Sequence, residues 1–381
     1  MTKKRAAKVI IFLLFVYIFS SCNQNEIFFR ISKELPPIIP RINGSSTNMV
    51  VYNSTLYVTT IGSSTIYTYK DGNWSPFSSP VGKIAALAAT LDYLYALAYT
   101  SDIRNCSLHR YNGTSWQQIT GGSGSLQSIW GANNTIFVGA MDGTTKVPST
   151  NNPNIQIDVP WWKIYYVSGT DTSLSNDPII SDIGQLNGAA FLTPNYYIAT
   201  SKGIYVGTLA SLPTSDIVNG STGNVTGIMN VNTIITAVTS GGQILKYSGT
   251  VFEPISTGGP PYTGAMGTWK ENGTGDDKLL LLGTKNGYRE LHLSGTGQPT
   301  STLAEPGVSS PSSLSDVGTF RVTIAKHPVY HIIQVPTTVS DSSHWVGGQP
   351  LIFASTYING VWSLKLSLNN GTWDVTWNGE R

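Results

Sequence analysis

The residue types most often used in catalysis do not stand in catalytic patterns in this chain. Cys106 has no second cysteine or histidine at motif spacing, so nothing marks it as a nucleophile or a zinc ligand. His327 and His331 are four residues apart, which in a strand separates them by about 13 Å, too far for a shared metal. Asp276 and Asp277 form the only acidic doublet, in a glycine-rich turn where we expect solvated side chains. We therefore predict no catalytic residue, no metal site and no cofactor.

Aromatic and amide side chains gather in long segments that suit ligand binding. The segment Asp142–Pro160 is rich in Asn and ends at a Trp-Trp pair, and a second segment, Pro336–Pro350, contains another Trp. Neighbouring side chains of a strand point to opposite faces, so at most one Trp of the pair would reach a ligand while the other packs. The candidate binding surface consists of Trp161, Trp162, Asn151, Asn154 and Trp345.

The first 22 residues have the organisation of an export signal. Four basic residues precede the apolar run Val9–Phe19, which is 11 residues long. A membrane span needs about 20 apolar residues, whereas a secretory signal uses about 7–15. Ser20 and Ser21 directly before Cys22 resemble the lipobox of bacterial lipoproteins, although Phe19 stands where that family usually has Leu. The resemblance implies cleavage before Cys22 and lipidation of its thiol and new amino group. An ordinary signal peptide and an uncleaved anchor are the alternatives.

The segment after Cys22 reads as a tether that holds a domain away from the bilayer. Residues 23–48 contain three prolines and the turn Asn43–Ser46. Ile27–Ile31 is too apolar for a pure linker, and we expect it to dock on the domain as a strand. We place the protein outside the cytoplasm, lipid-anchored to the cell envelope at the outer membrane, facing either the periplasm or the surface.

Composition indicates a β-rich domain. Only 12% of the 381 residues are charged, about half the usual share, while Gly and aromatic residues are plentiful. Strand and turn formers of this kind argue against a mostly helical protein or a coiled coil. Removing the four basic residues before Cys22 leaves 19 basic against 21 acidic residues, a net charge of −2. This charge gives no reason to expect a nucleic-acid partner.

From about residue 49 the chain repeats a pattern of short strands. A leading strand is followed by an apolar run that ends in small residues, then by an alternating strand and often by an aromatic-led one. Leading strands begin near residues 84, 126, 186 and 225, at spacings of 42, 60 and 39 residues. The apolar runs lie at residues 56–60, 94–98, 136–140, 196–200, 234–238, 279–283 and 351–355. Runs without polar alternation are typical of strands buried on both faces.

A period of about 40 residues with four strands resembles the blades of β-propellers. We predict an all-β propeller of seven four-stranded blades, with six or eight blades or a tandem β-sandwich as alternatives. The domains are a signal peptide at 1–21, the lipidated Cys and tether at 22–48, and the propeller at 49–381. Ring closure is expected to use Ile27–Ile31 or a strand near the C-terminus.

Propellers usually bind through the face that carries the second-to-third and fourth-to-first connections. We expect the long segments Asp142–Pro160 and Gly295–Val317 on this face, and Pro336–Pro350 on the opposite one. The sequence thus favours a monomeric, membrane-anchored binding or scaffold protein with a protein or glycan partner. Two alternatives remain: a glycan-active propeller enzyme, sialidase-like or glycoside hydrolase-like, that uses paired carboxylates, and an accessory lipoprotein of outer-membrane protein assembly.

Overall fold

The computed structural model describes residues 42, 49–70, 73–149, 154–182, 184–212, 216–270, 277–294, 299–303, 324, 327–335, 352–356, 360–369 and 372–379. The chain divides into two units, Met1–Arg41 with Arg381, and Ile42–Glu380, and every described residue belongs to the second unit. All named elements of this unit are strands. Within the described ranges, no helix is long and apolar enough to cross a bilayer.

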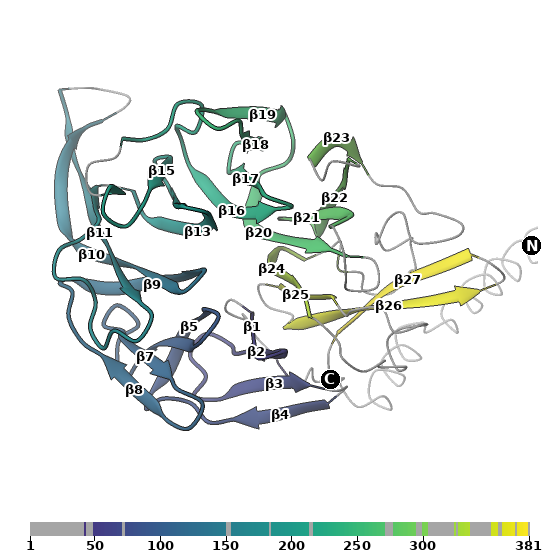
Figure 1. Ribbon diagram of the computed structural model, residues 1–381, viewed down its shortest axis with the longest axis horizontal. Helices are drawn as coiled ribbons and strands as arrows, with labels where there is room; N and C mark the ends of the chain where they lie inside the picture. The colour runs from purple at the N-terminus through teal and green to yellow at the C-terminus, as the bar shows by residue number, and fades with distance from the viewer. Residues whose placement is uncertain are drawn as a thin grey trace, which may run out of the picture. The chain divides into compact units, whose positions relative to one another are not determined.

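Consecutive strands pair antiparallel to form seven blades arranged in a ring (Figure 1). Blades 1 to 3 consist of β1 (Val50–Tyr52), β2 (Thr55–Val58), β3 (Ile66–Lys70) and β4 (Asn73–Phe77); β5 (Lys83–Ala89), β6 (Leu94–Tyr99), β7 (Ser107–Tyr111) and β8 (Trp116–Ile119); and β9 (Ser125–Ala132), β10 (Thr135–Pro148), β11 (Gln156–Ser168) and β12 (Ile180–Asp182). The leading strands expected near residues 84 and 126 are β5 and β9.

Blade 4 has three regular strands, β13 (Leu186–Leu192), β14 (Asn195–Thr200) and β15 (Ile204–Gly207), and the bridge between Tyr205 and Ile217 occupies the place of a fourth. Blades 5 to 7 consist of β16 (Val225–Val231), β17 (Ile234–Thr239), β18 (Ile244–Tyr247) and β19 (Phe252–Ser256); β20 (Tyr262–Trp269), β21 (Leu279–Thr284), β22 (Tyr288–Leu293) and β23 (Pro299–Leu303); and β24 (Val329–Gln334), β25 (Ile352–Thr356), β26 (Val361–Asn369) and β27 (Thr372–Gly379). The predicted seven-bladed all-β propeller is confirmed.

The core lies between adjacent blades. The second strands are buried along their whole length in β2, β21 and β25, because each is covered by a neighbouring blade on both sides. Outer strands such as β4 and β8 are mostly exposed. One apolar cluster joins blades 7 and 1, where the rings of Tyr69 and Phe353 lie 4.9 Å apart. In the described chain the ring therefore closes by side-chain packing between complete blades. The C-terminal strand β27 pairs within blade 7, and Ile27–Ile31 lies outside the described residues.

The first strands of successive blades contact one another around the axis. In every blade from 2 to 7 this strand contains a β-bulge, for example at Asn187 in β13 and Thr226 in β16. A bulged side chain is re-aimed toward the next blade: Asn187 Nδ2 donates to Val225 O at 2.7 Å. Glycines allow this approach. A Cβ on Gly131 would lie 1.9 Å from Ala89 O of the preceding blade.

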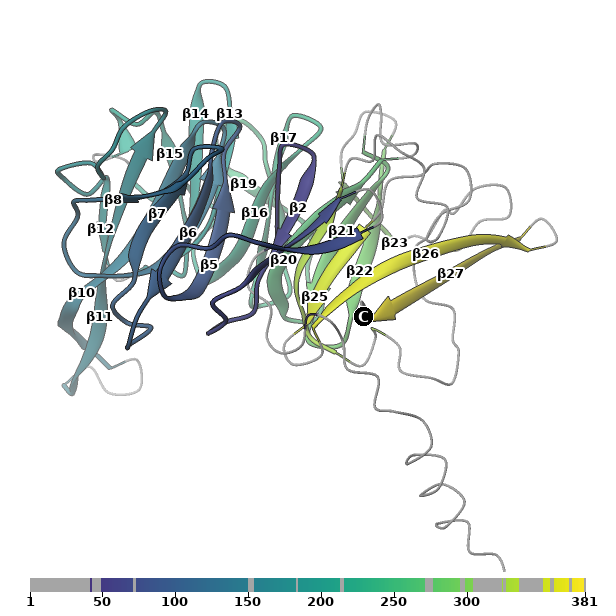
Figure 2. The same cartoon turned by 90° about the horizontal axis from the view of Figure 1, so that it is seen from below.

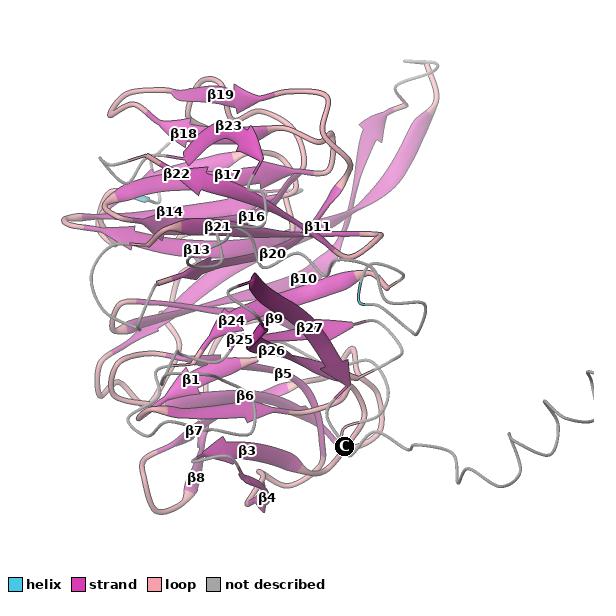
Figure 3. Ribbon diagram, turned by 90° about the vertical axis from the view of Figure 1, so that its right-hand side faces the viewer, coloured by secondary structure: helices cyan, strands magenta, loops and turns pink. Residues whose placement is uncertain are grey.

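Two expected loops differ in the structure. The segment Asp142–Pro160 is largely a two-stranded ribbon, in which β10 and β11 remain paired from Thr144↔Pro160 to Pro148↔Gln156. The segment Gly295–Val317 contains β23, the outer strand of blade 6. Pairing of the ribbon with β9 and β12 ends at Met141 and Trp162, so beyond these residues it projects from the ring (Figures 2 and 3).

Candidate functional site

A groove runs along the outer edge of the ring between blades 3 and 4. It consists of two adjoining depressions, of about 670 Å³ and 410 Å³, that share Ile179. The larger is lined by Tyr166, Asp171, Ser173, Leu174, Ser175, Asn176, Asp177, Pro178, Ile179, Leu209 and Ala210. The smaller is lined by Ile179, Ile180, Ser181, Lys202, Tyr205, Leu212, Asp216 and Ile217. We call this feature the rim groove.

The rim groove exists because both outer strands are short here. β12 has only three residues, and blade 4 replaces a fourth strand with one bridge at Ile217 and a hydrogen bond from Val218 N to Ile204 O. The connection from β11 to β12 is held against its own blade. Ser175 N donates to Tyr166 O at 2.8 Å, and Ile179 N donates to Ile164 O at 2.8 Å. The walls are thus loops, and the loops are fixed by backbone bonds.

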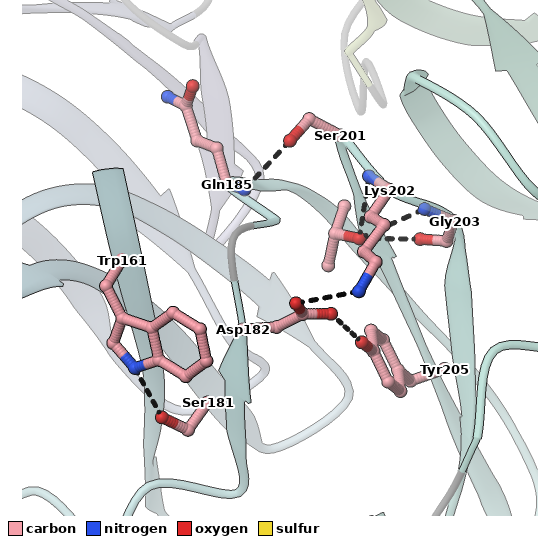
Figure 4. Close-up of polar contacts among 9 residues, drawn as sticks. Trp161, Ser181, Asp182, Gln185, Ser201, Lys202, Gly203 and Tyr205 are labelled. Carbon is pink, nitrogen blue, oxygen red and sulfur yellow. Dashed lines mark hydrogen bonds and ion pairs between the residues drawn. The ribbon is translucent and has the colours of Figure 1, made fainter. Parts of the chain in front are cut away.

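A polar cluster joins the two blades at one end of the groove (Figure 4). Lys202 Nζ lies 2.9 Å from Asp182 Oδ1, and the Tyr205 hydroxyl donates to Asp182 Oδ2. The Asp182 side chain is 13% exposed and that of Lys202 is 47% exposed. Burial, and then the neighbouring carboxylate of Asp182, raise the pKa of Tyr205 above its ordinary value. The phenol therefore stays protonated and acts as a donor at neutral pH.

The lining of the groove is acidic over an apolar floor. Its charged residues are Asp171, Asp177, Asp216 and Lys202, and the lysine is already paired with Asp182. The three aspartates are exposed, whereas Leu174, Ile179 and Leu212 are buried beneath them. Such a surface attracts cations and offers apolar contact at the same time.

A buried arginine supports the wall from behind. Arg110, on β7 of blade 2, is 5% exposed and donates from Nη1 to Asp171 O at 2.8 Å and to Gly169 O at 3.3 Å. Its guanidinium also lies 4.5 Å from the centre of the Tyr93 ring. These contacts fix the backbone at Asp171, and they leave the arginine inaccessible to a ligand in the groove.

The residues predicted to form a binding surface are not brought together as a set. Trp161 is partly exposed, and its Nε1 donates to Ser181 Oγ at 2.8 Å (Figure 4). By strand alternation it shares the side of β11 that carries Tyr165 and faces blade 2, so it does not line the groove. Trp162 is 6% exposed and packs inward on the other face of β11. Asn154 is exposed near the far end of the ribbon. Asn151, Trp345 and the lipidation candidate Cys22 lie outside the described residues.

Sequence reasoning missed Asp182, Lys202, Tyr205 and Asp216. The one available signal was the 60-residue spacing between leading strands 126 and 186, which shows that blade 3 contains about 20 residues more than its neighbours. Part of that excess forms the ribbon, and part forms the wall at residues 169–179. Spacing alone gives no residue roles, because Asp182 meets Lys202 only through the packing of blade 3 on blade 4.

Two acidic residues elsewhere in the described chain are buried, and Oδ1 of Asp277 has no hydrogen-bond partner. Asp277 is 7% exposed rather than solvated as expected, and its backbone exchanges two hydrogen bonds with the Asn232 side chain, from Asp277 N to Oδ1 at 3.0 Å and from Nδ2 to Asp277 O at 3.2 Å. Glu290, on the third strand β22, accepts from the Tyr288 hydroxyl at 2.7 Å. Among the described residues, no group of three or more His, Cys, Asp or Glu is placed to hold a metal ion.

The chain folds as a seven-bladed β-propeller. Solved structures of low sequence identity are similar to the chain. PorZ, an essential bacterial surface component of the type-IX secretion system of Porphyromonas gingivalis, is 10% identical with a TM-score of 0.53, and the match covers 90% of this chain and 39% of PorZ. The computationally designed Ika8 protein is 11% identical with a TM-score of 0.48, over 88% of this chain and 97% of that one. U3-55K is 12% identical with a TM-score of 0.49, and the match covers 84% of this chain and 90% of U3-55K. No protein-family model and no curated protein sequence matches the chain.

Proposed function

We propose that the protein is a lipid-anchored β-propeller of the bacterial cell envelope that binds another protein through the rim groove. The observation that carries this proposal is the composition of the groove, in which three exposed aspartates stand over a floor of buried aliphatic side chains. An extended polypeptide segment with Lys or Arg beside aliphatic residues matches both features. A closed ring with fixed loops suits such a role because little order is lost on binding.

The position of the buried carboxylates favours binding over glycan hydrolysis. A glycosidase site needs two carboxyl groups that flank the scissile bond. The two buried acids of the described chain do not lie on the first strands that line the axis: Asp277 precedes β21, and Glu290 on β22 accepts from the Tyr288 hydroxyl at 2.7 Å. The anchor is supported by the residues before Cys22 alone, through their resemblance to a lipobox.

The binding role is tested by crosslinking in intact cells followed by mass spectrometry. The test variant combines Asp177→Lys with Asp216→Lys, which reverses the charge of the groove at two exposed positions. We expect the crosslinked partner to fall by about tenfold or more, since each reversal replaces attraction by repulsion. Asp92→Lys, at an exposed turn of blade 2, is the matched control and should retain the partner. Equal recovery from all three proteins would contradict the proposal.

The anchor is tested separately by metabolic labelling with a fatty-acid probe. Label should enter the wild-type chain and be absent from Cys22→Ala. Label retained by that variant would show that Cys22 is not the acceptor.

A further inference from the structure

Exposed apolar side chains gather on one face of the ring. Because strands alternate in direction, the second-to-third and fourth-to-first connections share one face, which we call the loop face. Seven large apolar side chains of the described residues are strongly exposed, and five lie on or beyond the loop face: Ile61 (51%), Val81 (85%), Ile103 (43%), Ile155 (53%) and Ile157 (43%). Leu91 lies on the opposite face, and Tyr330 lies in the bulge of β24.

The loops that carry these side chains are neighbours and are held to each other. Ile61 and Val81 belong to adjoining loops, because Gly62 N donates to Ile84 O at 3.1 Å and Ile84 N donates to Ser63 O at 2.8 Å. Ile103 follows in the next blade, and the bridge between Cys106 and Leu126 links its loop to blade 3. The three tips therefore form an arc over blades 1 and 2.

The ribbon continues this arc from blade 3. Its cross-strand pairs divide into an apolar side, with Val147↔Ile157 and Thr145↔Val159, and a polar side, with Lys146↔Asp158 and Pro148↔Gln156. Alternation along β11 puts Ile157 and Val159 on the same side as Tyr165, which packs in the cluster between blades 2 and 3. At its base, the apolar side of the ribbon thus faces the blade that carries Ile103.

The chemistry of this surface fits a lipid bilayer better than a protein. The exposed side chains are aliphatic and project singly from separate loop tips, whereas protein interfaces favour a continuous patch rich in aromatic residues and Arg. A bilayer accepts isolated aliphatic tips because it requires no complementary shape. The exposed charges of the loops and ribbon over blades 1 to 3 nearly balance, with Lys83, Arg104 and Lys146 against Asp102 and Asp158. Lys163 and Asp142 are paired with each other.

The place at which the chain enters the ring also favours a bilayer as the partner of the loop face. β1 starts at the loop face, so Met49 lies on the side of the ring on which the apolar tips project. This step rests on the lipid anchor proposed above, because Cys22 precedes Met49 in the sequence. We propose that the loop face seats on a bilayer and inserts Ile61, Val81, Ile103 and the apolar side of the ribbon into its interfacial region.

Vesicle binding by residues 23–381 tests the inference without the lipid anchor. The ring closes within Ile42–Glu380, so this form keeps the folding unit intact. In a Cys106→Ala background, an environment-sensitive fluorophore is attached at Val81→Cys or, as the control, at Leu91→Cys. With phosphatidylcholine vesicles we expect a blue shift and brightening at position 81 and neither at position 91. Added phosphatidylglycerol should increase binding only slightly, because the face is almost neutral.

Flotation of unlabelled variants gives an independent readout. Val81→Asp combined with Ile157→Asp should reduce the vesicle-bound fraction by about tenfold or more, and Leu91→Asp should leave it unchanged. All three positions are exposed, so folding should be unaffected. An unchanged signal at position 81, or an equal loss from Leu91→Asp, would overturn the proposal and leave a protein as the occupant of the face. Because no lipidation is involved, this result is independent of the Cys22 labelling.

Discussion

The Tyr205 hydroxyl donates to the Asp182 carboxylate across the boundary between blades 3 and 4. The second oxygen of the same carboxylate receives Lys202 at 2.9 Å. Both contacts come from blade 4, whose described residues form three regular strands, and both end on the last residue of the short strand β12. The Asp182 side chain thus holds the outer edges of blades 3 and 4 together beside the rim groove. Without these two contacts, the edges would be free to move relative to each other.

Tyr205→Phe should lower the stability of the contact between blades 3 and 4 without removing the contact altogether. Loss of the hydroxyl leaves Asp182 with its lysine, and we expect about 1–2 kcal/mol less stability at pH 7. The wild-type pKa of Tyr205 is raised, so its contribution is complete below about pH 10 and is lost as the pH rises toward the folded value. The variant should therefore lose less stability between pH 9 and about pH 11. Urea unfolding at both pH values measures this. Tyr330→Phe, at an exposed position, is the control, and equal alkaline losses in both variants would refute the assignment.

Glycine at position 131 is required for the close approach of blades 2 and 3. An added Cβ would lie 1.9 Å from Ala89 O, a backbone atom that cannot move aside alone. Gly131→Ala should therefore cost about 3 kcal/mol or more. Gly241→Ala is the matched control, since the nearest atom to its added Cβ is Thr239 Oγ1 at 3.7 Å, and it should change stability by about 0.5 kcal/mol or less. Thermal unfolding of both variants decides the matter, and similar melting points would contradict the prediction.

The repeat was readable from the sequence because blade packing leaves a strong local signal. The run Leu279–Leu282 lacks polar alternation, and the structure shows β21 buried throughout between two blades. The leading strands near residues 84, 126, 186 and 225 correspond to β5, β9, β13 and β16. These strands could be predicted because burial on both faces leaves a pattern of apolar residues at a regular spacing, which the sequence shows directly.

The ribbon and the rim groove could not be read in this way. Asn and Pro near residues 151–153 signalled a loop, and that signal concealed the alternating residues Thr144–Pro148 that continue β10. All but one of the bulges of the first strands insert one residue, without a fixed residue type, as Asn187 and Thr226 illustrate. Contacts such as Asp182 with Tyr205 depend on how neighbouring blades are set against each other, which no local pattern encodes.

Cys106 should be an unreactive thiol. Burial, and then the nearby charge of Asp102, raise its pKa to about 11, and its Sγ donates to Ile103 O at 3.1 Å. Relative to an ordinary thiol of pKa 9.0, about one hundredth as much thiolate is present at pH 8, so alkylation of the chain without Cys22 should be about 100-fold slower. Thr114→Cys in a Cys106→Ala background places a thiol at an exposed turn as the control. A half-maximal rate for Cys106 near pH 9 would show the pKa to be unshifted.

His331 should make the ring sensitive to acid. It lies on β24, next to the axis, with Nδ1 buried and without a hydrogen-bond partner, and burial lowers its pKa to about 4. A lowered pKa means that the neutral ring stabilises the fold above the unfolded value of 6.5, and that this contribution is lost as the pH falls toward 4. The loss amounts to about 3 kcal/mol for this shift.

Replacement by an amide separates the contribution of His331 from that of His109. His331→Asn should flatten the fall in unfolding free energy between pH 6.5 and pH 4, as measured by urea denaturation at several pH values. His109, whose pKa burial also lowers, contributes in the same window, so His109→Asn serves as the comparison and should remove a smaller part. An asparagine cannot acquire a charge at the axis. The unfolding free energy of the variant, relative to that of the wild type, should therefore rise as the pH falls toward 4. A wild-type His331 that titrates near 6.5 by NMR, with parallel stability curves for the two proteins, would contradict this account.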